Sequence, residues 1–262
     1  MIRAHELTKT FGDVTAVQAI SFEVGRGEIF AFLGPNGAGK TTTIKMLTTL
    51  LKPSSGRVEI DGLNPATRQN EVRKCFGIVF QDSSTDDELT AYENMDFHGV
   101  LYKVPKRLRA ERIESLLKLF ELWDRRDDPV KQFSGGMRRR LEIARGLLHT
   151  PRILFLDEPT LGLDPQTRNQ LWKHVQKLNK EERVTVFLTT HYMEEAERVA
   201  HRIAIMDHGR IVAQGSVAEL KIQTGTESLE QAFLALTGTS IREEESGSTV
   251  RMRNMAKLFG RR

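Results

Sequence analysis

The sequence predicts an α/β fold with a mostly parallel sheet, an antiparallel β layer near its start and a helical subdomain inserted near its middle. Three observations lead to this prediction. Short β-prone runs separated by turns occupy residues 2–62, a helical pattern fills residues 82–150, and strand and helix patterns alternate after Pro151. Such alternation is typical of a parallel sheet that helices cover on both faces.

The antiparallel layer is predicted from runs that favour strands and are interrupted by turn residues. IRAHELTKTF, TAVQAISFEV and SGRVEI each favour a strand, and the Asp61-Gly62 pair after the third run signals a hairpin. We expect these strands to wrap around the first strand of the core, which residues 28–33 would form.

A strand, a loop and a helix are predicted from residue 28 onward. The apolar run at residues 28–33 breaks at Gly34, and helical periodicity resumes near Gly39. The helix positions that we expect to be buried are Ile44, Met46 and Leu47.

The loop between this strand and helix, GPNGAGKT at residues 34–41, matches the pattern of a phosphate-binding loop. Its glycines let backbone N–H groups turn toward one point and let a phosphate chain approach closely. We expect Lys40 to place its charge on the outer phosphates and the Thr41 hydroxyl to ligate Mg²⁺. The residues predicted to contact the nucleotide here are Gly34, Pro35, Asn36, Gly37, Ala38, Gly39, Lys40, Thr41 and Thr42.

The helical insertion is predicted from periodicity within residues 82–150. Ile113, Leu116, Leu117 and Phe120 follow one another at offsets typical of one face of an amphipathic helix. We therefore expect this segment to pack as helices against the rest of the domain.

After the insertion, the apolar run ILFL predicts a buried strand, and two adjacent carboxylates, Asp157 and Glu158, end it. Because side chains alternate along a strand, the two acids need not share one role. We expect Asp157 to hold Mg²⁺ through its water shell and Glu158 to orient or deprotonate the attacking water. The alternative is a solvated strand end before a turn, which Pro159 favours.

A third motif, FSGGM at residues 133–137, stands before a helical segment. Ser134 is suited to cap that helix, and Gly135 and Gly136 leave backbone N–H groups open to an anion. With this motif added to the phosphate loop and the acidic strand, the sequence resembles the ABC ATPase family over nearly its whole length.

The resemblance implies roles for residues outside these three motifs. Phe11 matches the aromatic residue that stacks on adenine, Gln81 matches the glutamine that touches Mg²⁺ and water, and His191 matches the switch histidine near the γ-phosphate. Residues 161–164 match the loop through which two subunits communicate. Each single residue has a local alternative: packing in a turn for Phe11, simple solvation for Gln81 and helix capping for His191.

Two positions depart from the family pattern, and the role of one charged run stays open. Met137 stands where glutamine is common, which removes a polar side chain but leaves the glycine N–H groups, and Leu161 stands where serine or threonine is frequent. The consecutive arginines at residues 138–140 form a charge run. For this run we favour a solvated or interdomain face over direct contact with the nucleotide.

The resemblance also implies an ATP hydrolase that uses ATP and Mg²⁺ and works as a pair of chains. Two identical or similar chains would pack head to tail, so that Ser134 and Gly136 of one chain cover the ATP that the other binds. The residues implied to be catalytic are Lys40, Gln81, Glu158 and His191.

The segments FSGGMRRRLEIARGLL and SLEQAFLALTGT look like the drug, antibiotic and lipid exporter branch related to daunorubicin-resistance ATPases. This likeness favours an export motor whose transmembrane permease is a separate chain. An importer motor would share every catalytic residue, and a soluble ABC ATPase acting on nucleic acid or ribosomes is a further alternative. Because basic residues are dispersed and not interleaved with aromatics, we expect no nucleic-acid partner despite the net charge of +4.

The domain organisation follows from these motifs. We expect an ABC ATPase domain over residues 1–238, with the helical subdomain at about residues 82–150, and a polar linker with a basic tail over residues 239–262. No apolar run approaches the ~20 residues of a membrane helix, and the N-terminus lacks a secretory signal. We therefore expect the protein at the cytoplasmic side of the cell membrane, peripheral and held by its permease partner.

Overall fold

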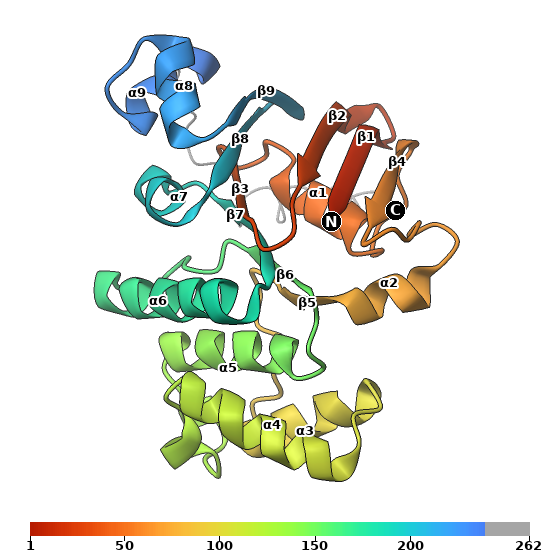
Figure 1. Cartoon of the computed structure of the whole chain (residues 1–262), viewed down its shortest axis with the longest axis vertical. Coiled ribbons are helices and arrows are strands. Elements are labelled where there is room, and N and C mark those ends of the chain that lie inside the picture. The colour runs from red at the N-terminus through yellow and green to blue at the C-terminus, as the bar shows by residue number, and fades with distance from the viewer. Residues whose placement is uncertain (239–262) are drawn as a thin grey trace, which may run out of the picture.

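The antiparallel β layer predicted for the start of the chain is present as a sheet of its own (Figure 1). The computed structural model describes residues 1–238. Within them, β1 pairs with β2 on one side and with β4 on the other, and both pairings are antiparallel. The strands of this sheet are β1 (Ile2–Phe11), β2 (Val14–Val24) and β4 (Ser55–Ile60).

The second sheet is the mostly parallel sheet that the sequence predicts. Its order is β5-β6-β7-β3-β8-β9, and only the edge strand β9 runs antiparallel to its neighbour. Every residue of β3, β6 and β7 is buried, which explains why the middle of each strand is apolar. The strands are β3 (Ile29–Leu33), β5 (Phe76–Val79), β6 (Ile153–Asp157), β7 (Thr185–Thr190), β8 (Arg202–Asp207) and β9 (Arg210–Gly215).

Six helices belong to the sheet-bearing part of the described chain, and α1 follows the predicted phosphate loop. Its Ile44, Met46 and Leu47 are buried, as the sequence predicts. The six are α1 (Lys40–Leu47), α2 (Gln69–Cys75), α6 (Pro165–Glu182), α7 (Met193–Val199), α8 (Val217–Thr224) and α9 (Leu229–Thr237).

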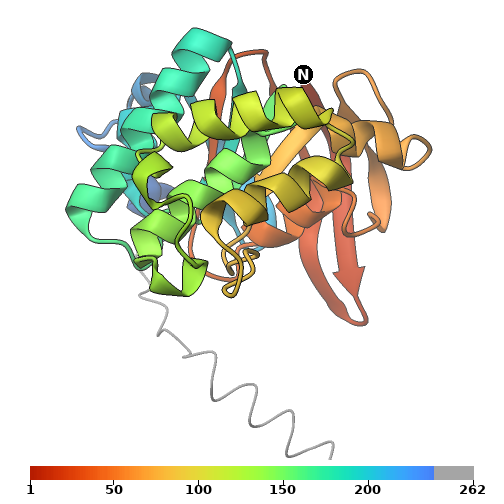
Figure 2. The same cartoon turned by 90° about the horizontal axis from the view of Figure 1, so that it is seen from below.

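The inserted helices gather at one end of the molecule. Figures 1 and 2 show α3 and α4 lying over α5, which itself lies beside α6. Ile113, Leu117 and Phe120 are fully buried there and Leu116 packs half-buried against the same core, as the amphipathic pattern predicts. The insertion comprises α3 (Ala91–Leu101), α4 (Lys106–Leu119), the 3₁₀ turns Trp123–Arg125 and Val130–Gln132, and α5 (Gly135–Leu147).

Helix α5 connects the insertion to the central sheet because it packs directly on β5. A Cβ atom placed on Gly77 of β5 would lie only 2.1 Å from the carbonyl oxygen of Gly146 on α5. Only glycine at this position allows the two backbones to approach so closely. The helix that begins with the SGG motif is therefore packed tightly against the strand that precedes Gln81.

The two sheets pack on each other through a cluster of phenylalanines. Phe22 of β2 lies among Phe30 and Phe32 of β3 and Phe187 of β7, and the rings of Phe32 and Phe187 are 4.9 Å apart between centroids. Contacts of this geometry add to the burial of large apolar surface. This core fixes the end of β3, and so the start of the phosphate loop.

The hairpin predicted at Asp61-Gly62 is wrong in one respect. Both residues have positive φ angles, 50° and 81°, as a tight turn requires, and a single bridge pairs Ile60 with Leu63. No strand returns after the turn, because Pro65 and the polar residues around it lead into α2 instead.

The linker and basic tail expected at residues 239–262 lie outside the described residues. No helix within residues 1–238 is long and apolar enough to cross a membrane.

Candidate active site

The predicted phosphate-site residues meet at the carboxyl ends of the parallel strands. The phosphate loop follows β3, Asp157 ends β6, and His191 follows β7, which lies between β6 and β3 in the sheet. Ligands of open α/β sheets bind at this edge. A cavity of about 470 Å³ lies there, lined by Ala16, Asn36, Gly37, Ala38, Gly39, Lys40, Thr41, Thr42, Gln81, Glu158, Leu161, His191 and Tyr192.

The phosphate loop is held against the rest of the domain by glycines that leave no room for a side chain. A Cβ on Gly34 would lie 2.3 Å from the carbonyl oxygen of Met206, and one on Gly39 would lie 2.6 Å from that of Ala16. Gly39 also has a φ of 103° and starts α1 without a side-chain cap. The N–H groups at this helix start are therefore not used by a capping side chain.

Lys40 is folded back over the loop and is almost completely buried. Its Nζ donates to the carbonyl oxygens of Gly34, at 2.7 Å, and Pro35, at 3.2 Å. The same ammonium lies 3.1 Å from Oε1 of Glu158. A full positive charge thus stands between the loop and the second carboxylate of the acidic strand.

Asp157 is held by hydroxyl groups rather than by a cation. Its Oδ1 accepts hydrogen bonds from the hydroxyls of Thr189, at 2.6 Å, and Thr41, at 3.0 Å. Burial raises the pKa of this carboxyl above its usual value, and the two hydroxyl bonds oppose the rise. A buried carboxylate beside a hydroxyl oxygen is the kind of oxygen donor pair that Mg²⁺ prefers.

Glu158, one residue further on, sits in the opposite electrostatic setting. Burial would raise its pKa, but the hydrogen bond with His191 and the charge of Lys40 outweigh burial, so the pKa lies below its usual value. His191 Nδ1 is 2.9 Å from Glu158 Oε2. Glu158 also has a φ of 49°, a left-handed conformation that side chains other than glycine adopt at a cost.

Gln81 and Phe11 occupy different positions relative to the cavity. Gln81 follows β5, is exposed and lines the cavity. Phe11 does not line it. Phe11 ends β1, next to the turn that leads into β2, and Ala16 of β2 does line the cavity. The ring of Phe11 is 47% exposed and has the ammonium of Lys9 5.0 Å from its centre. An exposed aromatic ring is free to stack on a flat ligand.

The structure does not bring the SGG motif into this cavity. Ser134 caps α5 by accepting a hydrogen bond from the N–H of Met137 at 3.3 Å, and Ser134 and Gly135 are exposed. A Cβ on Gly136 would lie 2.3 Å from Cγ2 of Thr167 at the start of α6. The motif therefore lies against the α6 end of the 161–164 loop.

Two residues at this edge were missed from the sequence. Thr189 holds both the carboxylate of Asp157 and the N–H of Glu158, and Tyr192 lines the cavity with its ring 4.1 Å from that of His191. The signal that could have identified Thr189 from the sequence was its position. A polar residue at the carboxyl end of a buried apolar strand faces the same edge as the acids at the end of the neighbouring strand.

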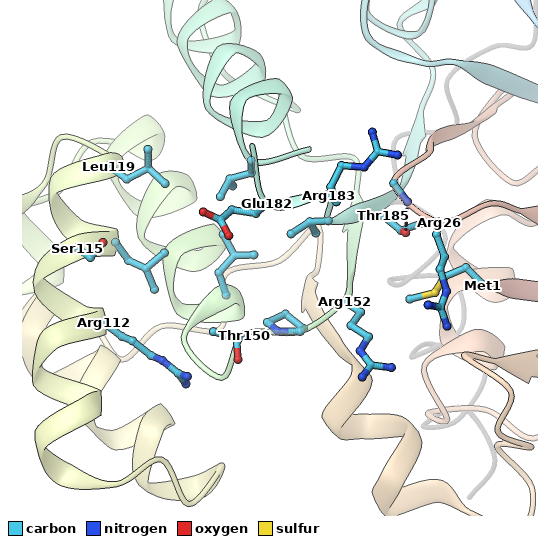
Figure 3. A pocket seen from close by; sticks show the side chains of 16 residues that line it. Met1, Arg26, Arg112, Ser115, Leu119, Thr150, Arg152, Glu182, Arg183 and Thr185 are labelled. Atoms are coloured by element: carbon cyan, nitrogen blue, oxygen red, sulfur yellow. Dashed lines mark hydrogen bonds between the residues drawn. The ribbon is translucent and has the colours of Figure 1, made fainter. Parts of the chain in front are cut away.

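A larger cavity, of about 640 Å³, lies at the opposite edge of the sheet, where β6 and β7 begin (Figure 3). Arg26, Arg112, Arg152 and Arg183 surround it, but Arg26 and Arg152 are exposed and both pair with Asp61. None of the predicted site residues lines it. Size alone favours this cavity. Of the two cavities, however, the smaller one is lined by buried groups of opposite charge, Lys40 and Glu158.

Comparison with known proteins gives the following relatives. The ABC transporter family model matches residues 17–161. A daunorubicin resistance ATP-binding protein, DrrA3 of Streptomyces coeruleorubidus, is 40% identical over 89% of this chain and 77% of its own length. The Nod factor export ATP-binding protein I of Ralstonia nicotianae is 41% identical over 82% of this chain and 66% of its own length.

Solved structures have the same fold. The dimeric ATP-binding cassette MJ0796, in a post-hydrolysis state bound to ADP and Pi, superposes with a TM-score of 0.74 at 29% identity. The superposition covers 82% of this chain and 98% of that chain.

Proposed function

Because this chain belongs to the ABC transporter family and is an ATP hydrolase of the ABC type, we propose that it is the motor subunit of an exporter. The transmembrane part of the exporter would be a separate polypeptide. The observation that carries this proposal is the similarity, over more than four fifths of the chain, to proteins named for daunorubicin resistance and Nod factor export. A drug, an antibiotic or a lipid-like molecule is the substrate class that these names support.

In the proposed mechanism, the phosphates of ATP compete with the present partners of Lys40. The ammonium lies within 3.2 Å of two loop carbonyls and of Glu158, so it is already placed over the loop. Binding of the γ-phosphate would draw Lys40 from Glu158 and free that carboxylate for the attacking water.

The oxygen donors beside the loop fit a magnesium ion. Thr41, Asp157 and Gln81 would hold it, because the hydroxyl of Thr41 is 3.0 Å from the carboxylate of Asp157 and Gln81 lines the same cavity. When bound, Mg²⁺ supplies positive charge to the β- and γ-phosphates.

Glu158 and His191 would act on the attacking water. The lowered pKa of Glu158 keeps it ionised at neutral pH, so it can accept a hydrogen bond or a proton from water. His191 is bonded to the same carboxylate at 2.9 Å, and we propose that it orients Glu158 and contacts the γ-phosphate.

The exposed position of Ser134 and Gly135 supports a head-to-tail dimer, either of this chain or with a similar one. Helix α5 begins there, outside the cavity of its own chain. ATP held by one chain would be covered by the motif of the other. Loss of the γ-phosphate then removes a contact that exists only in the closed state, which is sufficient to drive opening.

An exposed apolar face of the insertion supports the proposal of a membrane partner. Phe97, Val100 and Leu101 of α3 are 61%, 52% and 62% exposed, and their spacing places them on one face of the helix. Clustered apolar side chains on a surface mark binding to protein or membrane. We propose that this α3 apolar face docks the permease, which would hold the chain peripherally at the cytoplasmic side of the membrane.

Affinity purification of the tagged chain from detergent-solubilised membranes of its native host tests the proposal. We expect a stoichiometric protein with several membrane spans, identified by mass spectrometry. Phe97→Ser with Leu101→Ser should abolish its recovery, whereas Ile222→Ser on α8, at an 80% exposed position, should not. Ribosomal or DNA-bound partners without a membrane protein would overturn the exporter assignment.

Transport direction needs a separate measurement. Inside-out vesicles that contain the chain and its permease should accumulate an exported drug or lipid analogue when ATP is added outside. ATP-dependent loss of preloaded substrate from the same vesicles would indicate an importer instead.

A further inference from the structure

We propose that Arg139 is a positioning residue for ATP hydrolysis. It holds the two loops that carry Gln81 and Glu158 in fixed positions against helix α5. This inference rests on the proposed roles of those two residues. It concerns the middle member of the arginine run, which the sequence could not distinguish from its neighbours.

Arg139 is the buried arginine of the run, at 7% exposure. Its Nε donates to the carbonyl oxygen of Pro159 at 2.8 Å, and its Nη2 donates to that of Glu158 at 3.1 Å. Its Nη1 donates to the carbonyl oxygen of Phe80, the residue before Gln81. One guanidinium thus bonds the backbone at both loops that carry proposed catalytic side chains.

Glu142, one turn along α5, extends this contact. It pairs with Arg139 at 3.0 Å and is itself buried. Its other oxygen, Oε1, accepts a hydrogen bond from the N–H of Ser84 at 2.8 Å. The Arg139–Glu142 pair therefore holds the segment that contains Gln81 on both sides, at residue 80 and at residue 84.

The backbone of Glu158 is fixed from two directions. Its N–H donates to the hydroxyl of Thr189 at 3.1 Å, and its carbonyl oxygen accepts from Arg139. Such contacts are needed because the φ of Glu158, at 49°, is unfavourable for a residue with a side chain. A displacement of α5 would reach both catalytic loops, and displacements of about 1 Å can cost about 100-fold in rate.

Only arginine can make this set of contacts. The guanidinium offers five N–H donors in a flat fork, whereas a lysine ammonium is a compact group that cannot reach three separated carbonyl oxygens at once. Arg139→Lys therefore keeps the charge opposite Glu142 and removes the bonds to the loops.

Arg138 provides a matched control on the same helix. Its guanidinium also bonds two carbonyl oxygens, those of Phe133 and Lys131 at 3.3 Å each, and a carboxylate, that of Asp87. All three partners belong to the insertion. Asp87 shares the connection between β5 and α3 with Gln81, but it lies beyond Ser84, and Arg138 bonds neither Phe80 nor Glu158. Arg138→Lys therefore removes a similar set of bonds without touching the carbonyl oxygens beside Gln81 and Glu158.

Steady-state ATP hydrolysis by the purified full chain tests the proposal. We expect Arg139→Lys to lower kcat by about 10- to 100-fold with KM within about twofold of the parent chain, because the loss lies in the reaction step rather than in binding. Arg138→Lys should keep both constants within about twofold. Affinity for a fluorescent ATP analogue and the thermal midpoint should not differ between the two variants.

Two outcomes would overturn the proposal: an unchanged kcat in Arg139→Lys, or a fall in kcat that only follows a matching loss of nucleotide affinity and thermal midpoint. If Arg139→Lys does not fold, Arg139→Gln with Glu142→Gln removes both buried charges together. That double variant should show the same loss of kcat, and full activity in it would refute the positioning role. Hydrolysis that survives Glu158→Gln would instead contradict the proposed function of Glu158, whatever Arg139 does.

Discussion

The phosphate loop and the SGG motif both place the start of a helix where an anion could bind, but the two are built in opposite ways. At the start of α1, the cation Lys40 is buried and bonded within the chain to two carbonyls and a carboxylate. At the start of α5, Ser134 caps the helix and is exposed together with Gly135. One region holds its charges inside a cavity, and the other presents uncharged donors at the surface.

This difference indicates which steps each region can perform alone. A buried lysine and two buried acids can bind phosphates and act on water within one chain. A surface of backbone donors at a helix start offers little affinity by itself, and gains it when a charged phosphate is brought to it. In the proposed exporter, nucleotide binding therefore belongs to the first region and dimer closure to the second.

Removing the charge of the first region should give the largest effect. Lys40→Ala is expected to lower ATP turnover by about 10³-fold, about 4 kcal/mol of activation free energy, because among the described residues that line the cavity Lys40 is the one lysine or arginine. ATP affinity should fall in the same variant. Lys45→Ala, on the same helix α1 but outside the cavity lining, is the control and should retain activity. Retained turnover in Lys40→Ala would refute the site assignment.

Glu158→Gln should distinguish the role of the phosphate loop region from that of the SGG motif, because it should stop hydrolysis and leave dimer closure. The amide keeps the size of the side chain but cannot accept a proton, so turnover should fall by about 10²-fold or more while ATP still binds. With the γ-phosphate retained, light scattering in ATP and Mg²⁺ should detect a stable dimer. Monomers alone under these conditions would count against the head-to-tail arrangement.

Ser134→Ala should weaken the second region while leaving the first intact. The variant removes a helix cap, which costs about 1 kcal/mol of stability. Ser228 caps α9 in the same way, accepting from the N–H of Gln231 at 3.1 Å, so Ser228→Ala is the matched control. We expect equal losses of stability, but a further loss of turnover of about 10-fold in Ser134→Ala only. Equal turnover in both variants would mean that Ser134 acts as a cap and nothing more.

The two regions were not equally predictable from the sequence. Strands β3 and β6 are runs of residues buried on both faces. The break at Gly34 marks the end of β3 and the acid Asp157 marks the end of β6, so the positions of Lys40 and Asp157 followed from local pattern. The motif at Ser134 was also visible as a helix start. Its separation from the cavity was implied by the family resemblance and not by the local pattern, because the distance between two segments far apart in sequence depends on how the insertion packs.

Arg139 shows the same limit within a single helix. Consecutive helical residues point about 100° apart, so one of three adjacent arginines faces inward, but the run itself does not say which one. That choice depends on how close α5 comes to β5, which Gly77 allows. At Asp61 the local turn was predictable, whereas the missing return strand depended on Pro65 and the polar residues that follow.

The smallest predicted effect concerns the adjacent acids Asp157 and Glu158 beside the phosphate loop. Replacing each with its neutral amide should change the stability of the fold in opposite directions. Burial raises the pKa of Asp157, so its ionised form destabilises the fold above that raised pKa. Asp157→Asn should therefore raise the thermal midpoint at pH 7, by about 2–4 °C for each kcal/mol gained, when nucleotide and Mg²⁺ are absent. The gain should disappear as the pH falls below the usual Asp pKa of about 3.9.

Glu158→Gln should lower the midpoint at pH 7 under the same conditions. The pKa of Glu158 is lowered because the bond with His191 and the charge of Lys40 outweigh its burial, so the ionised form stabilises the fold. That stability is present above the usual Glu pKa and is lost as the pH falls through the lowered value. Plotted against pH, the thermal midpoints of the parent chain and of Glu158→Gln should meet there. Midpoints that shift in the same direction for both variants would contradict the opposite settings of the two acids, and with them the division of roles between metal binding and activation of water.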